Sequence, residues 1–376
     1  MRKIIQRLTR KQIILGLSGI LVFCIGLIIY IISALMASKQ DTQDVASRWS
    51  DQKNVSQISC FFSREADMSV DSILRFEHNL TRSLEEASII SESENKNARL
   101  WADSYSATGK VVLESNRGSM TVNAVGIGGD FFLFHPLQLI SGAYFSGNDV
   151  LKDYIVIDED AAWQLFGSND VVGQLITIRG VPHIITGVIQ REQGKLEEAA
   201  GLNTSVAYVS YETLSNYGTN FGINTYEIVM PNPVSGYAKK YVFENIGVDE
   251  NNVDIVENTT RYNLIAKIKL LAQFGTRSMS SKAIIYPYWE NIARGYEDIL
   301  QILFFIMVLL FLYPMVLLVI CFIVLWKHKT WTVKSVFFRI QDWVQRQMER
   351  YRSSKKHRKK IEKKKVRHKE VKNEKV

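Results

Sequence analysis

The chain has 376 residues, of which 47% are hydrophobic and three are cysteine. This composition excludes a disordered chain, a disulfide scaffold and a zinc-finger array. The net charge of +8 is unevenly distributed: the first 12 residues hold five basic residues and no acid, and the last 50 hold 19 basic and five acidic residues. The region between these two ends holds 22 basic and 33 acidic residues and is therefore acidic. Two basic ends around an acidic middle are not typical of a soluble enzyme.

Two long uncharged segments predict transmembrane helices. Residues 13–37 and residues 302–326 each contain 25 residues without a charge, and roughly 20 apolar helical residues are enough to cross a bilayer. A buried core helix would be shorter and amphipathic. A cleaved signal peptide would have an apolar region of only about 7–15 residues. We therefore expect transmembrane helices at 13–37 and 301–326.

The charges beside these segments predict their orientation. Lys and Arg near a span stay on the cytoplasmic side, and they fill residues 1–12 and the segment from Lys327 onward. The inner flanks, near Asp44 and Glu297, are acidic or mixed. We expect a two-pass protein of the cell membrane, with both termini cytoplasmic and a large extracytoplasmic domain at residues 38–300.

The domain between the spans is expected to mix helices and strands. Alternating and β-branched stretches predict strands at 55–63, 101–107, 110–115, 120–127, 175–179, 183–189, 205–210 and 225–230. Helical spacing and capping residues predict helices at 69–87, 158–166, 235–246 and 260–274. In the first of these helices the apolar residues expected near one side are Val70, Ile73, Leu74, Phe76, Leu80 and Leu84. Gly109 is expected to turn the chain inside a hairpin, and the polar stretch 190–203 is expected to be a mobile loop.

Catalytic motifs are not found. The sequence contains no HExxH, CxxC, GxSxG or P-loop pattern. His183 is expected to be structural, the glycines at 126–129 to form a turn, and the acids at 158–160 to begin a helix rather than bind calcium. The sequence thus predicts a protein that is not an enzyme, with no catalytic residue, no cofactor and no metal.

Six short elements follow one another between residues 122 and 191. They are GIGGDFF at Gly126–Phe132, LISGAYFS at Leu139–Ser146, a strand ending in Val156-Ile157-Asp158, LFG at Leu165–Gly167, VGQL at Val172–Leu175 and IITGV at Ile184–Val188. In this order they resemble the core domain of the MacB- and FtsX-like permeases of ABC transporters. The resemblance extends to the architecture of a basic amino-terminal segment, a first span, a large outer domain and a second span.

The resemblance implies an α+β extracytoplasmic domain between two transmembrane helices. A porter-like split α/β part would occupy residues 50–141 and 221–295, with an inserted β-rich subdomain at about 142–220. Such permeases have four spans and MacB has a fused ATPase, whereas two spans and no P-loop are found here. From this departure we expect a truncated two-span variant of the family.

The resemblance therefore implies a non-catalytic membrane subunit of an ABC-type transporter or mechanotransmission complex. A P-loop ATPase and a four-span permease would be supplied in trans, and a homo- or hetero-dimer would suit the family. The alternative is a membrane-anchored scaffold or binding protein of the bacterial cell envelope, with no ATPase link.

The segment after the second span predicts contacts with membrane lipids and a partner. Residues 327–351 have the spacing of an amphipathic juxtamembrane helix, and residues 352–376 form a polybasic cytoplasmic tail. Contact is expected from one side of that helix, at Trp331, Phe337, Ile340, Trp343 and Val344. Nucleic acid is not expected, because no aromatic residues interleave the basic run.

Pro314 interrupts the second predicted span. Proline lacks the N–H that would bond to the preceding turn, and its ring crowds that carbonyl. We therefore expect either a static kink or a hinge at Pro314.

Overall fold

The computed structural model describes residues 10–50, 54–89, 98–273, 283–327, 338 and 341–348. It divides into two compact units, residues 1–24 with 309–376 and residues 25–308. Helices α2 (Arg10–Ser38) and α11 (Tyr288–Lys327) each contribute to both units.

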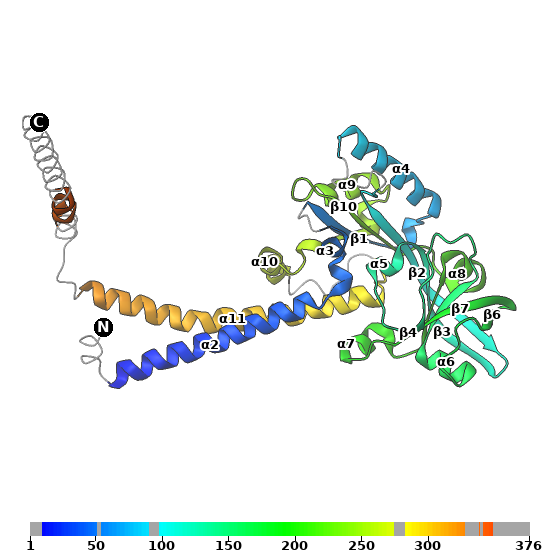
Figure 1. Ribbon diagram of the computed structural model, residues 1–376, viewed down its shortest axis with the longest axis horizontal. Coiled ribbons are helices and arrows are strands. Elements are labelled where there is room, and N and C mark those ends of the chain that lie inside the picture. Colours follow the sequence, from blue (N-terminus) through cyan, green and yellow to red (C-terminus); the bar gives the residue numbers. More distant parts are fainter. Residues whose placement is uncertain are drawn as a thin grey trace, which may run out of the picture. The chain divides into compact units, whose positions relative to one another are not determined.

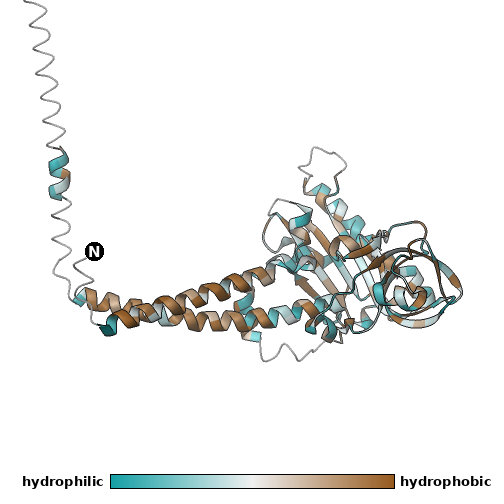
Figure 2. Ribbon diagram, turned by 60° about the horizontal axis from the view of Figure 1, so that its bottom comes forward, coloured by the Kyte–Doolittle hydropathy of each residue, from teal (hydrophilic) through white to brown (hydrophobic). Residues whose placement is uncertain are grey.

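Both helices are long and apolar enough to cross a membrane, and Figure 2 shows hydrophobic residues along most of each. Only 11% of the most apolar stretch of α2 and 0% of that of α11 are buried. A core helix of a soluble domain would be mostly buried. The two predicted apolar segments therefore lie in helices suited to a bilayer.

In the first unit the two helices approach each other closely at small side chains. Gly19 is buried, and a Cβ atom at this position would lie 3.0 Å from Cδ1 of Leu317. One residue earlier, the Ser18 hydroxyl lies 2.8 Å from the hydroxyl of Tyr313. Small residues and interhelical hydrogen bonds are typical of helix packing in membranes.

The second unit contains the folded domain. Its described strands are β1 (Val55–Phe62), β2 (Ala102–Ser115), β3 (Gly118–Gly129), β4 (Leu139–Gly142), β5 (Tyr154–Asp158), β6 (Leu175–Ile178), β7 (Val181–Ile189), β8 (Val206–Ser210), β9 (Thr219–Asn220), β10 (Thr225–Pro231) and β11 (Val253–Glu257). Its α-helices are α3 (Val45–Trp49), α4 (Val70–Glu86), α5 (Phe131–Phe134), α6 (Glu159–Phe166), α7 (Lys195–Glu197), α8 (Tyr211–Tyr217), α9 (Tyr237–Asn245) and α10 (Leu264–Gln273). Shorter helical turns are η1 (Asp41–Gln43), η2 (Arg64–Ala66), η3 (Glu198–Leu202), η4 (Glu250–Asn252) and η5 (Asn258–Thr260). The predicted α+β class is confirmed.

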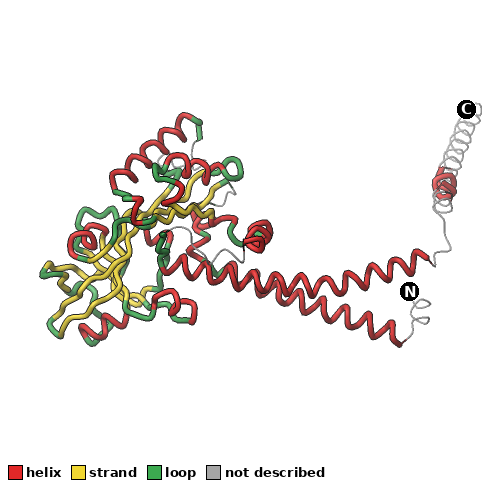
Figure 3. The backbone as a smooth tube through the Cα atoms, turned by 180° about the vertical axis from the view of Figure 1, so that it is seen from behind, coloured by secondary structure: helices red, strands yellow, loops and turns green. Residues whose placement is uncertain are grey.

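The strands form a single mixed sheet, drawn in yellow in Figure 3. Its order is β11-β1-β10-β2-β3-β8-β5-β7-β4, with β6 paired to β2 and β7, and β9 paired to β2. The pairs β3–β8 and β5–β7 are parallel, and the other pairs are antiparallel. The hairpin of β2 and β3 joins the two ends of the sheet, because the start of β2 pairs with β10 and its end pairs with β6.

Helices α4 and α9 pack on the β1–β10–β11 end of the sheet (Figure 1). Helix α4 begins at Ser69, whose hydroxyl accepts the N–H of Ser72, a cap that satisfies an otherwise unpaired donor. It buries four apolar side chains: Ile73, Phe76, Leu80 and Leu84. Leu74, which the sequence pattern grouped with them, is 54% exposed.

Helix α6 packs on the other end of the sheet and confirms the expected role of the acidic triplet. The Asp158 carboxylate accepts the N–H of Ala161 at 2.8 Å, and Gly167 ends the helix with φ 76°. That left-handed conformation is available to glycine without steric cost.

Three expectations about loops are wrong. Strand β2 continues through Gly109, and the hairpin turns at residues 116–117 instead. A side chain at Gly109 would lie 2.3 Å from the carbonyl oxygen of Thr219 on β9, so glycine is required there for close approach of two strands. The stretch 126–129 belongs to β3 rather than to a turn, and 190–203 contains α7 and η3.

Candidate coupling site

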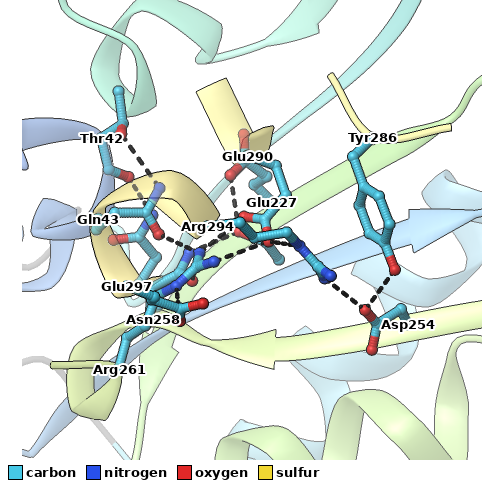
Figure 4. A network of polar contacts seen from close by, with 12 residues as sticks. Thr42, Gln43, Glu227, Asp254, Asn258, Arg261, Tyr286, Glu290, Arg294 and Glu297 are labelled. Carbon is cyan, nitrogen blue, oxygen red and sulfur yellow. Dashed lines mark hydrogen bonds and ion pairs between the residues drawn. The ribbon is translucent and has the colours of Figure 1, made fainter. Parts of the chain in front are cut away.

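The first turns of α11 are inserted into the domain and carry one charged residue, Glu290, that is almost completely buried. Trp289, Glu290, Ile292, Ala293, Leu300 and Gln301 are buried, whereas none of the most apolar stretch of the helix is buried. A buried charge is costly unless it is paired and hydrogen-bonded. The partners of Glu290 therefore define the candidate site, which is drawn in Figure 4.

Arg261, directly after η5, forms a two-pronged ion pair with Glu290. Its Nη1 lies 2.7 Å from Oε2 of Glu290 and its Nη2 lies 2.8 Å from Oε1. The two side chains are 3% and 1% exposed. Burial alone would lower the pKa of Arg261, but the carboxylate of Glu290 raises it well above its usual range. The two parallel hydrogen bonds make the pair geometrically specific.

The same guanidinium joins the ends of both long helices. Its Nε donates to Oε1 of Glu297, two turns further along α11, at 2.6 Å. Its Nη1 also donates to Oε1 of Gln43 at 2.8 Å. Gln43 ends η1, which follows α2 directly. Arg261 thus connects the chain after β11 with α11 and with the segment that leaves α2.

Arg294 extends the network to the edge strand β11. It donates from Nε to Glu290 at 2.6 Å and from Nη2 to Oδ2 of Asp254 at 2.8 Å. The hydroxyl of Tyr286 donates to the same oxygen of Asp254 at 2.8 Å, and the guanidinium lies 3.8 Å from the centre of the Tyr286 ring. Burial raises the pKa of Tyr286, so that the hydroxyl keeps the proton it donates.

A second buried group links α11 to the centre of the sheet. Glu227 on β10 accepts the hydroxyl of Ser59 on β1 at 2.7 Å and pairs with His135, which follows α5. The His135 ring lies 4.4 Å from the ring of Trp289 on α11. At the first residue of α11, the hydroxyl of Tyr288 lies 2.6 Å from that of Tyr208 on β8. The start of α11 therefore contacts the edge strand β11 through Arg294 and the inner strand β8 through Tyr288.

A cavity of about 530 Å³ lies beside this site. Its walls come from β1, β2, β3, β8 and β9 and from the segment before α11, and they include Phe62, Arg64, Lys110, Phe221, Tyr286 and Tyr288. The Arg64 guanidinium lies 3.4 Å from the centre of the Phe221 ring. Groups of three or more His, Cys, Asp or Glu side chains suited to a metal ion do not occur among the described residues.

The contact residues expected from the sequence follow the second span. Trp331, Phe337 and Ile340 lie outside the described residues. Trp343 and Val344 belong to a helical segment at 341–348 and are 63% and 40% exposed; their contact role stays a prediction.

Pro314 lies inside α11, which continues through it. Neither the kink nor the hinge expected there is tested, and both stay predictions. His183 is buried, with Nδ1 bonded to the carbonyl of Val181 and Nε2 lying 3.2 Å from the hydroxyl of Thr213. This arrangement fits the structural role expected for His183.

Sequence reasoning missed Arg261, Glu290 and Arg294. The sequence indicates part of this network. Glu290 and Arg294 are four residues apart, a spacing at which opposite charges pair on one face of a helix. Both residues precede an apolar segment that contains no charge. The pairing of Arg261 with Glu290 spans 29 residues, and no local pattern indicates it.

Comparisons with known proteins relate most of the chain to one domain family. The sequence profile of the MacB-like periplasmic core domain matches residues 18–237, more than half of the chain. The macrolide export ATP-binding/permease protein MacB of Agrobacterium fabrum is 32% identical over 119 residues, which cover 30% of this chain and 18% of that protein. Its counterpart in Chromobacterium violaceum is 31% identical over 103 residues, covering 26% and 15%. The matched region thus spans less than a fifth of these relatives.

Two solved structures are also similar to part of the chain. The periplasmic region of MacB from Actinobacillus actinomycetemcomitans has 18% identity and a TM-score of 0.38, covering 57% of this chain and 92% of that one. The extracellular domain of the noncanonic ABC-type transporter YknZ from Gram-positive bacteria has 17% identity and a TM-score of 0.35, covering 53% and 99%.

Proposed function

Because the chain belongs to the family of the MacB-like periplasmic core domain, we propose that it is a non-catalytic membrane subunit of an ABC-type transporter or mechanotransmission complex. Its relatives are ATP-binding/permease proteins, whereas its own sequence has no P-loop. In this proposal a P-loop ATPase in trans would supply the energy, and a four-span permease in trans would supply further membrane helices.

The connection of α11 to the domain is the observation that carries this proposal. One helix of 40 residues contains both the apolar span and the buried turns around Glu290. A displacement of α11 along its axis would pull on Arg261 through two carboxylates at once, and on Asp254 through Arg294. Because these charges are buried, separating them would leave uncompensated charges inside the protein, which is costly. The domain would therefore follow α11 rather than detach from it.

The orientation and the domain limits are part of the proposal. The basic flanks favour cytoplasmic termini and an extracytoplasmic domain at 38–300. The porter-like part would comprise residues 50–141 and 221–295, and the insert about 142–220. In this arrangement Tyr208 belongs to the insert, and α11 would act on both parts. Residues 327–351 would meet the lipids and the partner, with the polybasic segment 352–376 held at the anionic leaflet.

Orientation can be tested with a single accessible cysteine. Cys60 is unsuitable because it is completely buried, whereas Val150 is 94% exposed. The Val150→Cys variant should react with a membrane-impermeant maleimide added to cells with a permeabilised outer wall. A reporter after Val376 should behave as cytoplasmic. Labelling of Val150→Cys only after the membrane is opened would reverse the proposed orientation.

The partner can be tested by isolating the full chain from its own membranes in a mild detergent. We expect a P-loop ATPase to be retained and to hydrolyse ATP, while the chain alone shows no hydrolysis. Recovery of the chain without an ATPase, from membranes in which both are present, would contradict the proposal. That result would favour the alternative, an envelope scaffold or binding protein. The cavity beside Tyr286 and Tyr288 would then be the place to look for a ligand.

A further inference from the structure

Helix α10 exposes an apolar face that the domain does not cover. Leu264, Ile265, Ile268 and Leu271 are 59%, 65%, 54% and 47% exposed, and no residue of the helix is buried. At about 100° per residue these four side chains fill an arc of about 120° on one side. Four large apolar side chains grouped in this way, rather than scattered singly, indicate an interaction surface.

Two lysines border this apolar face. Lys267 and Lys269 each lie about 40° outside the arc, one on either side of it. Ala266 and Leu270, on the opposite side, are half-buried. A lysine stem can lie along an apolar surface while its ammonium group reaches the polar layer above it. Apolar residues between two lysines are the pattern of a helix that lies in a membrane interface.

The position of α10 brings this face to the membrane. The helix begins three residues after Arg261, which is bonded to Glu297 on α11. Five residues after Glu297 the uncharged segment of α11 starts, about 7.5 Å further along the helix axis at 1.5 Å per residue. Figures 1 and 3 show α10 nearly end-on and the neighbouring part of α11 from the side, so that α10 runs crosswise to it.

We propose that α10 is an interfacial anchor that lies on the leaflet facing the domain. Its apolar face enters the boundary between acyl chains and headgroups, and Lys267 and Lys269 reach the lipid phosphates. Continuity with the transmembrane segment of α11 favours lipid over a protein partner, because the anchored start of α10 cannot be far from the bilayer surface. The proposal is independent of any ATPase partner.

Spin labels on the full chain in proteoliposomes of phosphatidylcholine and phosphatidylglycerol test this proposal. The background carries Cys24→Ala and Cys321→Ala, with the buried Cys60 retained. Labels are attached in Ile268→Cys and, as a matched control, in Leu74→Cys on α4. Both positions are apolar, helical and 54% exposed. Collision rates are then measured with oxygen, which concentrates in lipid, and with a water-soluble nickel chelate.

We expect the ratio of oxygen to nickel collisions to be several-fold higher at position 268 than at position 74. Equal, water-like ratios at both positions would overturn the proposal. An immobilised label at 268 that neither reagent reaches would also overturn it, because a protein partner or a second copy would then cover α10. Unchanged thermal unfolding of both variants verifies that the labels report on the native domain.

Discussion

Replacing Arg261 by methionine tests whether the buried ion pair holds α11 to the domain. Methionine retains much of the apolar stem but removes donors to Glu290, Glu297 and Gln43. Glu290 keeps one bond, from Arg294, but its Oε2 loses the Arg261 donor inside the protein. Breaking one side of a buried ion pair costs about 3–5 kcal/mol.

For a domain of this size, 1 kcal/mol corresponds to roughly 2–4 °C in the midpoint of thermal unfolding. We take about 3 kcal/mol, the lower end of the range for the ion pair, because Arg294 compensates in part. The expected decrease in the midpoint is then about 6–12 °C. Near-ultraviolet circular dichroism of the full chain in detergent micelles measures it.

Arg82→Met is the matched control. Arg82 also pairs with a glutamate, Glu86, but the two side chains are 73% and 66% exposed. Such surface pairs contribute about 0.2–1 kcal/mol, so the midpoint should fall by no more than about 4 °C. If Arg261→Met lowers the midpoint no further than Arg82→Met does, the buried network does not hold α11 to the sheet, and the coupling argument fails.

Four further predictions concern other parts of the chain. Burial, together with the charge of Glu77, raises the pKa of Asp103 well above its usual range. The Asp103 carboxyl therefore keeps its proton in the folded state at pH values above about 4, where the unfolded state releases it. The folded protein therefore loses stability as the pH rises above about 4. Asp103→Asn should raise the unfolding midpoint near neutral pH but not at about pH 4; equal shifts at both would argue against the raised pKa. Cys60 should react with a maleimide only after denaturation, since burial raises its pKa and hides its sulfur; rapid native labelling would disagree. Gly19→Leu should separate the two apolar helices and lower the yield of an engineered disulfide between positions 18 and 313, and an unchanged yield would exclude close packing there. Pro314→Ala should leave membrane insertion intact, and it should abolish the coupling of α11 motion to the domain only if Pro314 is a hinge. A variant with normal coupling would exclude the hinge.

Local patterns predicted the elements whose causes are local. The apolar segments identified α2 and α11, and Asp158 with Gly167 marked both ends of α6. Periodicity also found α4, although it assigned Leu74 to the buried side. That position lies at the edge of the apolar arc, where tertiary packing decides exposure.

The coupling site could not be predicted in the same way. Its contacts join residues far apart in the chain: Arg261 with Gln43 across 218 residues and Glu227 with His135 across 92. A charged residue in a sequence is normally solvated, and only the fold reveals that Glu290 is buried. Gly109 was misread for a related reason. A glycine that permits two strands to approach closely is indistinguishable in sequence from a glycine in a turn.

The central claim is that α11 transmits ATP-driven motion to the domain through the Arg261–Glu290 network. Hydrogen–deuterium exchange of residues 254–261 and 288–300, in the complex isolated with its partner ATPase, tests this claim most directly. We predict that ATP changes the exchange of both segments together, and that Arg261→Met removes the change in 254–261 while leaving ATP hydrolysis intact. Identical exchange of both segments with and without ATP, in a complex that hydrolyses ATP, would contradict the account.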